Sequence, residues 1–378
     1  MVSKSSNLFS SKIISVPEVL NKSYLPELDG LRGIAIITVI ISHAVLNTSL
    51  ARYLIGDIGV EIFFVLSGFL ITTLLLKESL KEGRVSFRNF YIRRALRILP
   101  VAYLFLILLV FLNYLFKLNI SNGSFLASAF YVKNLHFNST SDWYSAHFWT
   151  LSIEEQFYII FPLFLIYKLD NYVKVTYFLI LVIPILQFLG YNNVGIFYSN
   201  YAIHKSIFLL INLFGNGSTS ILIGSLLSIL MFKGLSLAKN LKINHFLSFV
   251  IFIIAIIFRV TCINLVDSTY LTSTIFSIAI ALVIFLCLIN NGDFLSRLLK
   301  NKILVKLGVL SYSLYIWQQI FLYKQPWANS FKYADSLFLN VPALFIVAYL
   351  SYHFYELKFL KLKEKFKSVG YNINHKTL

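Results

Sequence analysis

Apolar residues run along this chain in long blocks that are separated by short polar stretches. A helix of about 20 apolar residues can cross the ~30 Å hydrocarbon core of a bilayer. The blocks therefore predict an all-α, polytopic integral membrane protein with about ten transmembrane helices. We expect these helices at residues 33–50, 58–76, 98–116, 148–167, 173–190, 207–232, 246–262, 270–290, 303–322 and 337–356.

The sixth of these segments is interrupted by the polar run GNGSTS, from Gly215 to Ser220. Broken backbone at membrane depth is tolerated only where it is buried in protein or lines a cavity. Residues 207–214 are therefore expected to form either part of this span or a separate interfacial or re-entrant piece.

The composition supports a membrane location. Hydrophobic residues make up 58% of the 378 positions, charged residues make up 13%, and the mean hydropathy is +0.76. Soluble domains contain ~45–50% apolar and ~25% charged residues. The predicted spans leave no stretch long enough for a second soluble core. Residues 1–31 lack an apolar region followed by a cleavage site, so we expect the first span to act as an uncleaved anchor.

The net charge of +17 follows from topology rather than from nucleic-acid binding. Positive charge in multi-pass proteins collects on cytoplasmic loops. With the N-terminus in the cytoplasm and ten alternating spans, 26 of the 33 Lys and Arg residues fall on cytoplasmic segments. The pattern predicts two cytoplasmic termini, with an N-terminal segment at 1–32, a transmembrane domain at 33–357 and a basic tail at 358–378.

Ionisable residues within or beside the predicted spans are the candidates for chemistry. Each such group costs roughly 2.5–3.5 kcal/mol or more at the bilayer centre, so one that persists indicates function. Asp29 and Arg32 lie just before the first span, and His43 lies about 16 Å further along the helix at ~1.5 Å per residue. An ordinary interfacial arginine and a histidine bonded to a neighbouring helix would explain the same pattern.

The second predicted span opens with the sequence GVEIFFVLSGFL. Glu61 lies near its outer end, where we expect partial hydration. Ser67 and Gly68 are small residues of the kind that lets helices approach closely. Helix packing explains most of this segment.

Three arginines, Arg93, Arg94 and Arg97, precede the third span on its cytoplasmic side. Residues three and four apart share a helix face. Planar guanidinium groups bind phosphate oxygens in pairs, so this cluster suits a polyphosphate ligand. Topology signalling or contact with anionic lipids is the alternative interpretation.

The fourth span begins with the sequence HFWTLSIEEQFY. The i, i+4 spacing places Thr150, Glu154 and Tyr158 on one helix face, whereas Glu155 points elsewhere. Two adjacent carboxylates at the start of an apolar helix are costly unless solvent at the outer interface reaches them. The two cysteines, Cys262 and Cys287, lie in apolar segments and indicate core residues rather than a disulfide framework or a metal site.

Together these segments resemble the acyltransferase-3 family of integral membrane acyltransferases, many of which O-acetylate surface polysaccharides. The matching motifs are the Arg-x10-His start, the G-V-(D/E)-x-F-F-V-L-S-G-F-L span, the F-x-x-R-R-x-x-R-x-x-P loop and the W-(S/T)-L-x-x-E-E-Q-F-Y helix. A later sequence, LGVLSYSLYIW at residues 307–317, is similar to the family's Y-S-L-Y-x-W segment. The motifs follow one another in order along almost the whole chain.

The chain departs from the family pattern at several positions. Gln318 stands where the family often has His, and Glu61 stands where Asp is common. The polar run before Gly224 lacks the Arg and the acidic pair that are often found there. Many relatives also carry an extracytoplasmic SGNH-type esterase domain, which we do not expect here because the chain ends shortly after its last predicted span.

The resemblance implies an O-acetyltransferase in the cytoplasmic (inner) membrane. The donor would be cytoplasmic acetyl-CoA, and the acceptor would be a sugar hydroxyl on a cell-surface or lipid-linked glycan such as an O-antigen. His43 would act either as the general base or as a covalent acyl carrier. No metal is implied, and the oligomeric state stays open. The implied site residues are His43, Glu154, Arg32 and Asp29 for catalysis, Arg93, Arg94 and Arg97 for the donor, and Glu61, Trp149, Glu155, Gln156 and Tyr158 for the substrate.

Three other functions fit parts of the pattern. A transporter or flippase of a glycan or lipid precursor would explain intramembrane charges and one broken helix, although such folds often break matching helices in two halves. A receptor-like or scaffolding protein would use the arginine loop for lipid but gives no role to His43 and Glu154. A membrane-bound O-acyltransferase of the other superfamily would place its histidine late in the chain, where His353 is the candidate.

Overall fold

A computed structural model describes residues 13, 15–46, 48–52, 56–135, 142–191, 194–195, 199–215, 217–234, 244–265, 269–290 and 292–366. Within these residues all regular secondary structure is helical, as the sequence predicts. Short helical turns at Ser49–Arg52 (η1), Lys133–Leu135 (η2) and, in π form, Ser351–Glu356 (η3) join the longer elements. The α-helices are α1 (Glu18–Asn21), α2 (Pro26–Ala44), α3 (Asp57–Glu82), α4 (Phe87–Phe116), α5 (Asn122–Ala129), α6 (Phe148–Tyr167), α7 (Leu169–Tyr191), α9 (Tyr201–Phe214), α10 (Ser218–Phe232), α11 (Leu247–Leu265), α12 (Thr269–Ile289), α13 (Phe294–Leu299), α14 (Lys302–Phe321), α15 (Leu337–Leu350) and α16 (Leu357–Glu364).

Each of the ten apolar segments predicted above overlaps at least one helix, and this is a multi-pass membrane protein. Among the described residues, six helical stretches are long and apolar enough to span a bilayer: α3, α4, α6, α7, α12 and the run from α15 through α16. The α9–α10 pair gives a seventh if it counts as one bent span. The count of ten crossings and the cytoplasmic location of both termini stay predictions.

Several helices extend beyond their predicted apolar windows. Helix α4 begins at Phe87 rather than at residue 98, because the hydroxyl of Ser86 caps the backbone N–H of Asn89 and the basic segment continues the same helix. Helix α2 begins at Pro26, in the first helical turn where proline is tolerated, and ends at Ala44 instead of residue 50. The helices α2, α3 and α4 therefore extend beyond the apolar core of the bundle, and their ends carry charged residues.

Small residues let the central helices approach one another closely. A methyl group at Gly68 on α3 would collide with the backbone carbonyl of Ile221 on α10, and one at Gly224 would collide with the carbonyl of Val65. The prediction that Gly68 serves helix packing is therefore confirmed. The same kind of contact joins α2 to α14, where Gly308 lies against the backbone of Asp29.

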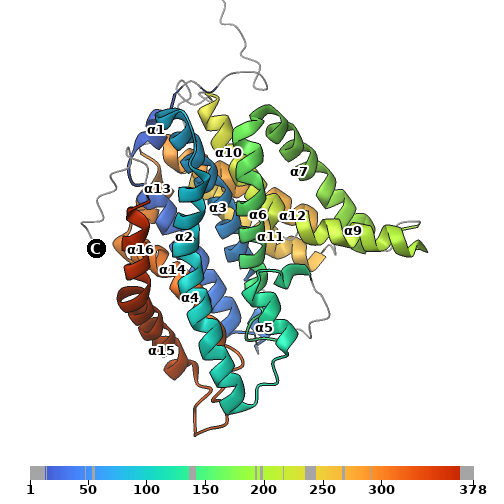
Figure 1. Cartoon of the computed structure of the whole chain (residues 1–378), viewed down its shortest axis with the longest axis vertical. Coiled ribbons are helices and arrows are strands. Elements are labelled where there is room, and N and C mark those ends of the chain that lie inside the picture. The colour runs from blue at the N-terminus through green and yellow to red at the C-terminus, as the bar shows by residue number, and fades with distance from the viewer. Residues whose placement is uncertain are drawn as a thin grey trace, which may run out of the picture.

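The predicted break in the sixth segment is confirmed. Helices α9 and α10 meet at an angle of 47°, and Figure 1 shows α9 reaching out sideways from the bundle. The hydroxyls of Ser218 and Thr219 donate to the carbonyls of Leu213 and Phe214. These side chains satisfy backbone acceptors that the interrupted helix leaves free.

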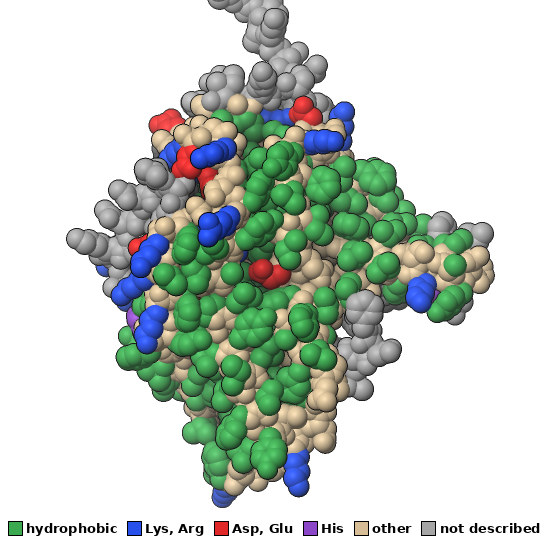
Figure 2. Space-filling view, viewed as in Figure 1, with side chains coloured by type: hydrophobic (Ala, Val, Ile, Leu, Met, Phe, Trp, Pro, Cys, Tyr) green, Lys and Arg blue, Asp and Glu red, His purple; other side chains and the backbone are tan. Residues whose placement is uncertain are grey.

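The surface divides into an apolar middle and more polar ends. Figure 2 shows hydrophobic side chains across the middle of one face, with charged side chains gathered at the upper end and along one edge. In Figure 1 the helix α1 lies at that upper end. We call this end of the bundle the basic end. We define it by the lysines and arginines that line a common cavity there: Lys22, Arg32, Lys77, Arg94, Arg97 and Lys363.

Candidate active site

A cavity of about 350 Å³ lies between α2, α3, α4, α6 and α14. On α3 its wall runs from Lys77 to Val60, which corresponds to about 25 Å at 1.5 Å per residue. The cavity is therefore long and narrow, and it extends from the basic end into the apolar core. This shape suits an elongated ligand with a charged head.

The mouth of the cavity is strongly basic. Its lining includes all six residues that define the basic end, and only two acidic residues, Asp29 and Glu154. One guanidinium nitrogen of Arg32 donates to the Asp29 carboxylate at 2.9 Å, so this cation is partly neutralised. Arg94 keeps a buried Nε without a hydrogen-bond partner among the described residues. The mouth thus carries an excess of positive charge with donors available for an anion.

Arg94 is held in part by an aromatic ring. Its guanidinium carbon lies 3.9 Å from the centre of the Tyr158 ring, a cation–π contact that positions the charge. Arg94 and Arg97, which the sequence analysis assigns to the donor, and Tyr158, which it assigns to the substrate, all line the cavity.

The opposite end of the cavity is apolar and closed by a hydrogen-bonded pair. Val60, Phe63 and Phe64 line it, and the hydroxyls of Thr150 and Tyr315 lie 2.6 Å apart. A carbonyl group brought to this point would meet little competing water, which favours attack by a hydroxyl over hydrolysis.

His43 lies just beyond this closed end and does not line the cavity. Its Nδ1 atom is 2.6 Å from the side-chain oxygen of Gln318, which follows Tyr315 by three residues on α14. A methyl group at Gly56, the residue before α3 and four residues before Val60, would lie 3.8 Å from the His43 Nε2 atom. Both relationships place the imidazole about one helical turn, or ~5–6 Å, past the cavity. His43 is partly exposed.

The other predicted catalytic residues face the cavity rather than His43. Glu154 accepts a hydrogen bond of 2.6 Å from the Ser67 hydroxyl. The structure therefore places Gln318, not Glu154, against the imidazole. The spacing argument is confirmed, since Thr150, Glu154 and Tyr158 line the cavity and Glu155 does not.

Two residues predicted to bind ligands are engaged elsewhere. Arg93 does not line the cavity and forms an ion pair of 2.7 Å with Glu78. Glu61 is buried, with an ion pair of 2.7 Å to Arg259, so the expectation of partial hydration at Glu61 is wrong. Charge neutralisation inside the bundle explains why these groups persist there.

The remaining predicted substrate residues lie behind the cavity wall. Trp149 packs edge-on against Phe64 at 6.1 Å between ring centres. Gln156 exchanges hydrogen bonds with Asn134 and therefore ties α6 to η2. Glu155 has one buried carboxylate oxygen without a partner among the described residues.

Three residues near the site carry no sequence signal that predicts their place: Tyr315, Gln318 and His147. Tyr315 lies inside the late aromatic motif, and Gln318 is a departure from the family pattern. His147 is buried, and both of its ring nitrogens lack hydrogen-bond partners among the described residues. Its ring lies 5.7 Å from that of Tyr315, which closes the cavity.

The cysteines and the late histidine lie apart from this site. Cys287 is buried as predicted, whereas Cys262 is only partly buried, and both are free thiols. His353 is exposed on η3 between the rings of Tyr349 and Tyr352. An exposed position gives no support to the alternative based on a late embedded histidine.

The family model described as an acyltransferase domain matches residues 25–354, which include His43 and most of the residues that line this cavity. The chain belongs to the acyltransferase-3 family. The Bacillus subtilis (strain 168) protein named "Putative peptidoglycan O-acetyltransferase YrhL" is 32% identical over 364 residues, 88% of this chain and 54% of that protein. The chain thus spans about half the length of this acyltransferase-3 relative.

Two further relatives carry related names. The Staphylococcus aureus (strain COL) protein "Putative O-acetyltransferase SACOL0978" is 31% identical over 371 residues, which cover 89% of this chain and 58% of that protein. "Peptidoglycan O-acetyltransferase OatA" of Listeria monocytogenes (strain EGD-e) is 40% identical over 158 residues, 39% of this chain and 25% of that protein. No solved structure matches this acyltransferase-3 chain.

Proposed function

We propose that this protein is a membrane O-acetyltransferase that moves an acetyl group from cytoplasmic acetyl-CoA to a hydroxyl of an envelope glycan. The observation that carries the proposal is the position of His43 one turn past the closed end of a long cavity with a basic mouth. Family membership and the names of the relatives support acetyl transfer, and they make peptidoglycan the first acceptor to test.

In this proposal the donor enters at the basic end. Arg94 and Arg97 bind the phosphate groups of CoA, since guanidinium groups pair with phosphate oxygens in a fixed planar geometry. The pantetheine arm extends along α3, past Ser67, toward Phe63. The linear shape of that arm matches the length and narrowness of the cavity.

The acceptor approaches His43 from the opposite side of the bundle. Nε2 of the neutral imidazole takes the proton of the acceptor hydroxyl as its oxygen bonds to the thioester carbonyl carbon. The carbon–sulfur bond then breaks, CoA leaves as the thiolate, and the imidazolium returns the proton to sulfur. Movement of the Thr150–Tyr315 pair opens the single turn that separates the cavity from the imidazole.

A transporter or flippase is the competing function, and the bent α9–α10 pair is the observation that favours it. A transported solute would need a path through the closed end of the cavity and would leave chemically unchanged. Consumption of the thioester therefore separates the two functions.

The test uses the full chain in membranes of a deletion strain complemented with wild type, His43→Ala or the control Cys262→Ser at matched expression. We expect ester-linked acetyl on envelope glycan, and labelled CoA release in vesicles, with wild type and Cys262→Ser but not with His43→Ala. Equal acetylation by His43→Ala would overturn the role of His43. Solute accumulation without release of CoA would replace the enzyme by a transporter.

A further inference from the structure

A chain of amide hydrogen bonds reaches from a backbone carbonyl to His43. Gln319 donates from Nε2 to the backbone oxygen of Trp143 at 2.6 Å, and Gln318 donates from Nε2 to the Oε1 atom of Gln319 at 2.7 Å. The Oε1 atom of Gln318 then faces Nδ1 of His43 at 2.6 Å. Both glutamines are buried, so water does not substitute for these bonds.

The direction of this chain is fixed at its first link. A backbone carbonyl oxygen only accepts, so the side chain of Gln319 has to turn its NH2 group toward Trp143. The Oε1 atom of Gln319 then faces Gln318, so Gln318 has to donate a hydrogen bond from its own NH2 group. Gln318 therefore presents only an acceptor to His43, and the Nδ1 atom of His43 has to carry the proton.

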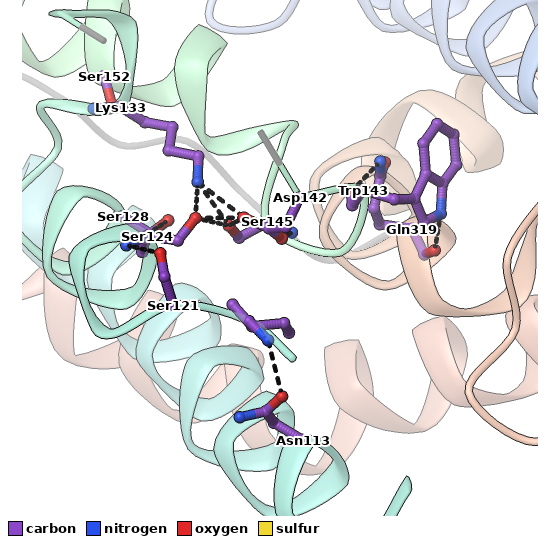
Figure 3. A network of polar contacts seen from close by, with 11 residues as sticks. Asn113, Ser121, Ser124, Ser128, Lys133, Asp142, Trp143, Ser145, Ser152 and Gln319 are labelled. Atoms are coloured by element: carbon purple, nitrogen blue, oxygen red, sulfur yellow. Dashed lines mark hydrogen bonds and ion pairs between the residues drawn. The ribbon is translucent and has the colours of Figure 1, made fainter. Parts of the chain in front are cut away.

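The first link is itself held in place. The indole N–H of Trp143 donates to the backbone oxygen of Gln319 at 2.8 Å, so Trp143 and Gln319 are joined twice. Asp142, the residue before Trp143, bonds Lys133, Ser124 and Ser145 in a compact polar network, which Figure 3 shows next to the Trp143–Gln319 pair. The Trp143 ring also packs edge-on against the His43 ring at 5.2 Å.

We infer that Gln318 and Gln319 are positioning residues that lock His43 in the Nδ1-protonated tautomer and leave Nε2 as the reactive nitrogen. This inference rests on the proposed function for its catalytic meaning, although the tautomer itself follows from the geometry alone. It also explains the departure from the family pattern at Gln318. A neutral imidazole at this position also has one acceptor nitrogen for His43 and one donor nitrogen for Gln319.

The free nitrogen lies on the Gly56 side of the imidazole ring. A methyl group added at Gly56 would lie 3.8 Å from Nε2, so the glycine leaves space beside this atom. A lone pair at this atom is therefore available to an acceptor hydroxyl, whereas Nδ1 is buried against Gln318. The tautomer thus decides whether the unprotonated nitrogen is Nε2, which can meet the acceptor, or Nδ1, which is bonded to Gln318.

The direct test is nitrogen NMR of the full chain in lipid, with ¹⁵N in the histidine rings and His43→Asn to assign the signal. We expect wild type to show a protonated Nδ1 and an unprotonated Nε2 at neutral pH. Gln318→Leu and Gln319→Leu are expected to lose this signature and to lower kcat at least about tenfold, as outer-shell changes commonly do, with little change in the KM for acetyl-CoA. Gln318→His is expected to keep both the NMR signature and the kcat of wild type.

Gln319→Leu is the more informative variant because Gln319 does not touch His43. A wild-type signal from protonated Nε2, or an unchanged signal and kcat in both leucine variants, would overturn the inference. If the signature changes as expected while wild type transfers no acetyl group, the tautomer assignment stands and the proposed function fails. Folding of each variant is checked by its thermal unfolding in detergent, and the wild-type spectrum decides the tautomer even where a variant does not fold.

Discussion

The guanidinium group of Arg94 on α4 lies over the ring of Tyr158 on α6, 3.9 Å from its centre. The contact joins two helices that line the cavity. Such contacts contribute about 0.5–2 kcal/mol. The Arg94–Tyr158 contact brings together the arginine cluster on α4 and the helix α6, which are far apart in the sequence.

Replacing Arg94 by Ala is expected to raise the KM for acetyl-CoA by about tenfold or more. A charge-assisted hydrogen bond contributes about 1.5–3 kcal/mol, and 1.4 kcal/mol corresponds to a factor of ten. Tyr158→Phe keeps the ring and is expected to preserve the KM, whereas Tyr158→Leu is expected to raise it. Initial rates at varied acetyl-CoA measure these effects, and an equal loss in both Tyr158 variants would contradict the cation–π role.

Replacing Arg93 by Gln is expected to leave the KM for acetyl-CoA within about twofold of wild type, because a distant side chain contributes little to binding. Arg93 points away from the cavity and pairs with Glu78. The variant is expected to lower the thermal stability of the protein instead. A KM increase as large as that of Arg94→Ala would place Arg93 in the donor site after all.

Removing either partner of the buried Glu61–Arg259 pair is expected to destabilise the protein by about 3–5 kcal/mol, since the remaining charge stays buried and unpaired. Glu61→Leu and Arg259→Leu therefore unfold at lower temperature in detergent. The double variant is expected to recover most of the loss, because an apolar pair needs no solvation. If Glu61→Leu alone kept full stability and lost only activity, Glu61 would belong to the substrate site.

Gly224→Leu is expected to separate α10 from α3 and to abolish stable insertion. The added side chain would meet the backbone carbonyl of Val65, which cannot move aside as a side chain can. Overpacking in a well-packed core costs about 1–3 kcal/mol or more. Gly123→Ala serves as a control for space, since a methyl group there meets only the Ser121 hydroxyl oxygen, at 3.9 Å. Protein levels in membranes and melting temperatures distinguish the two variants.

The Asp142 network is expected to weaken in acid. Burial raises the pKa of Asp142, but hydrogen bonds from Ser124, Lys133 and the backbone of Ser145 outweigh it and hold the pKa below its usual value of 3.8. A lowered pKa means that the folded protein favours the carboxylate. The resulting stabilisation is complete well above pH 3.8 and is lost as the pH falls through the folded-state pKa.

Melting temperatures of wild type and Asp142→Asn as a function of pH measure this effect. The stability advantage of wild type is expected to be constant near neutral pH and to shrink in the acidic range below pH 3.8. An advantage that persists unchanged at the lowest pH would show that the carboxylate charge does not hold this loop.

The sequence predicted the helices well because burial in a bilayer imposes a length and an apolar pattern on each segment. All ten windows overlap helices, and the break before Ser218 is present. The helix ends were less predictable. At Phe87 a capping hydroxyl, which hydropathy does not register, sets the start of α4.

The candidate site was only partly predictable. The spacing of Thr150, Glu154 and Tyr158 fixed their common face, because helix periodicity is local. The partners of Glu61 and Arg93 could not be read from the chain. A charged residue in an apolar segment signals either a site or an ion pair, and the choice depends on which distant residue packs against it.

The sequence by itself determined the class of the molecule, its apolar helices and the residue types of its chemistry, since these follow from hydropathy and from motifs read in order. The tertiary structure decided which of those residues meet. His43 and Gln318 are separated by 275 positions, yet their side chains form the bond that fixes the imidazole. Such a contact arises only when α2 and α14 pack together, because hydrogen bonds between side chains depend on distance in space and leave no local periodic signal.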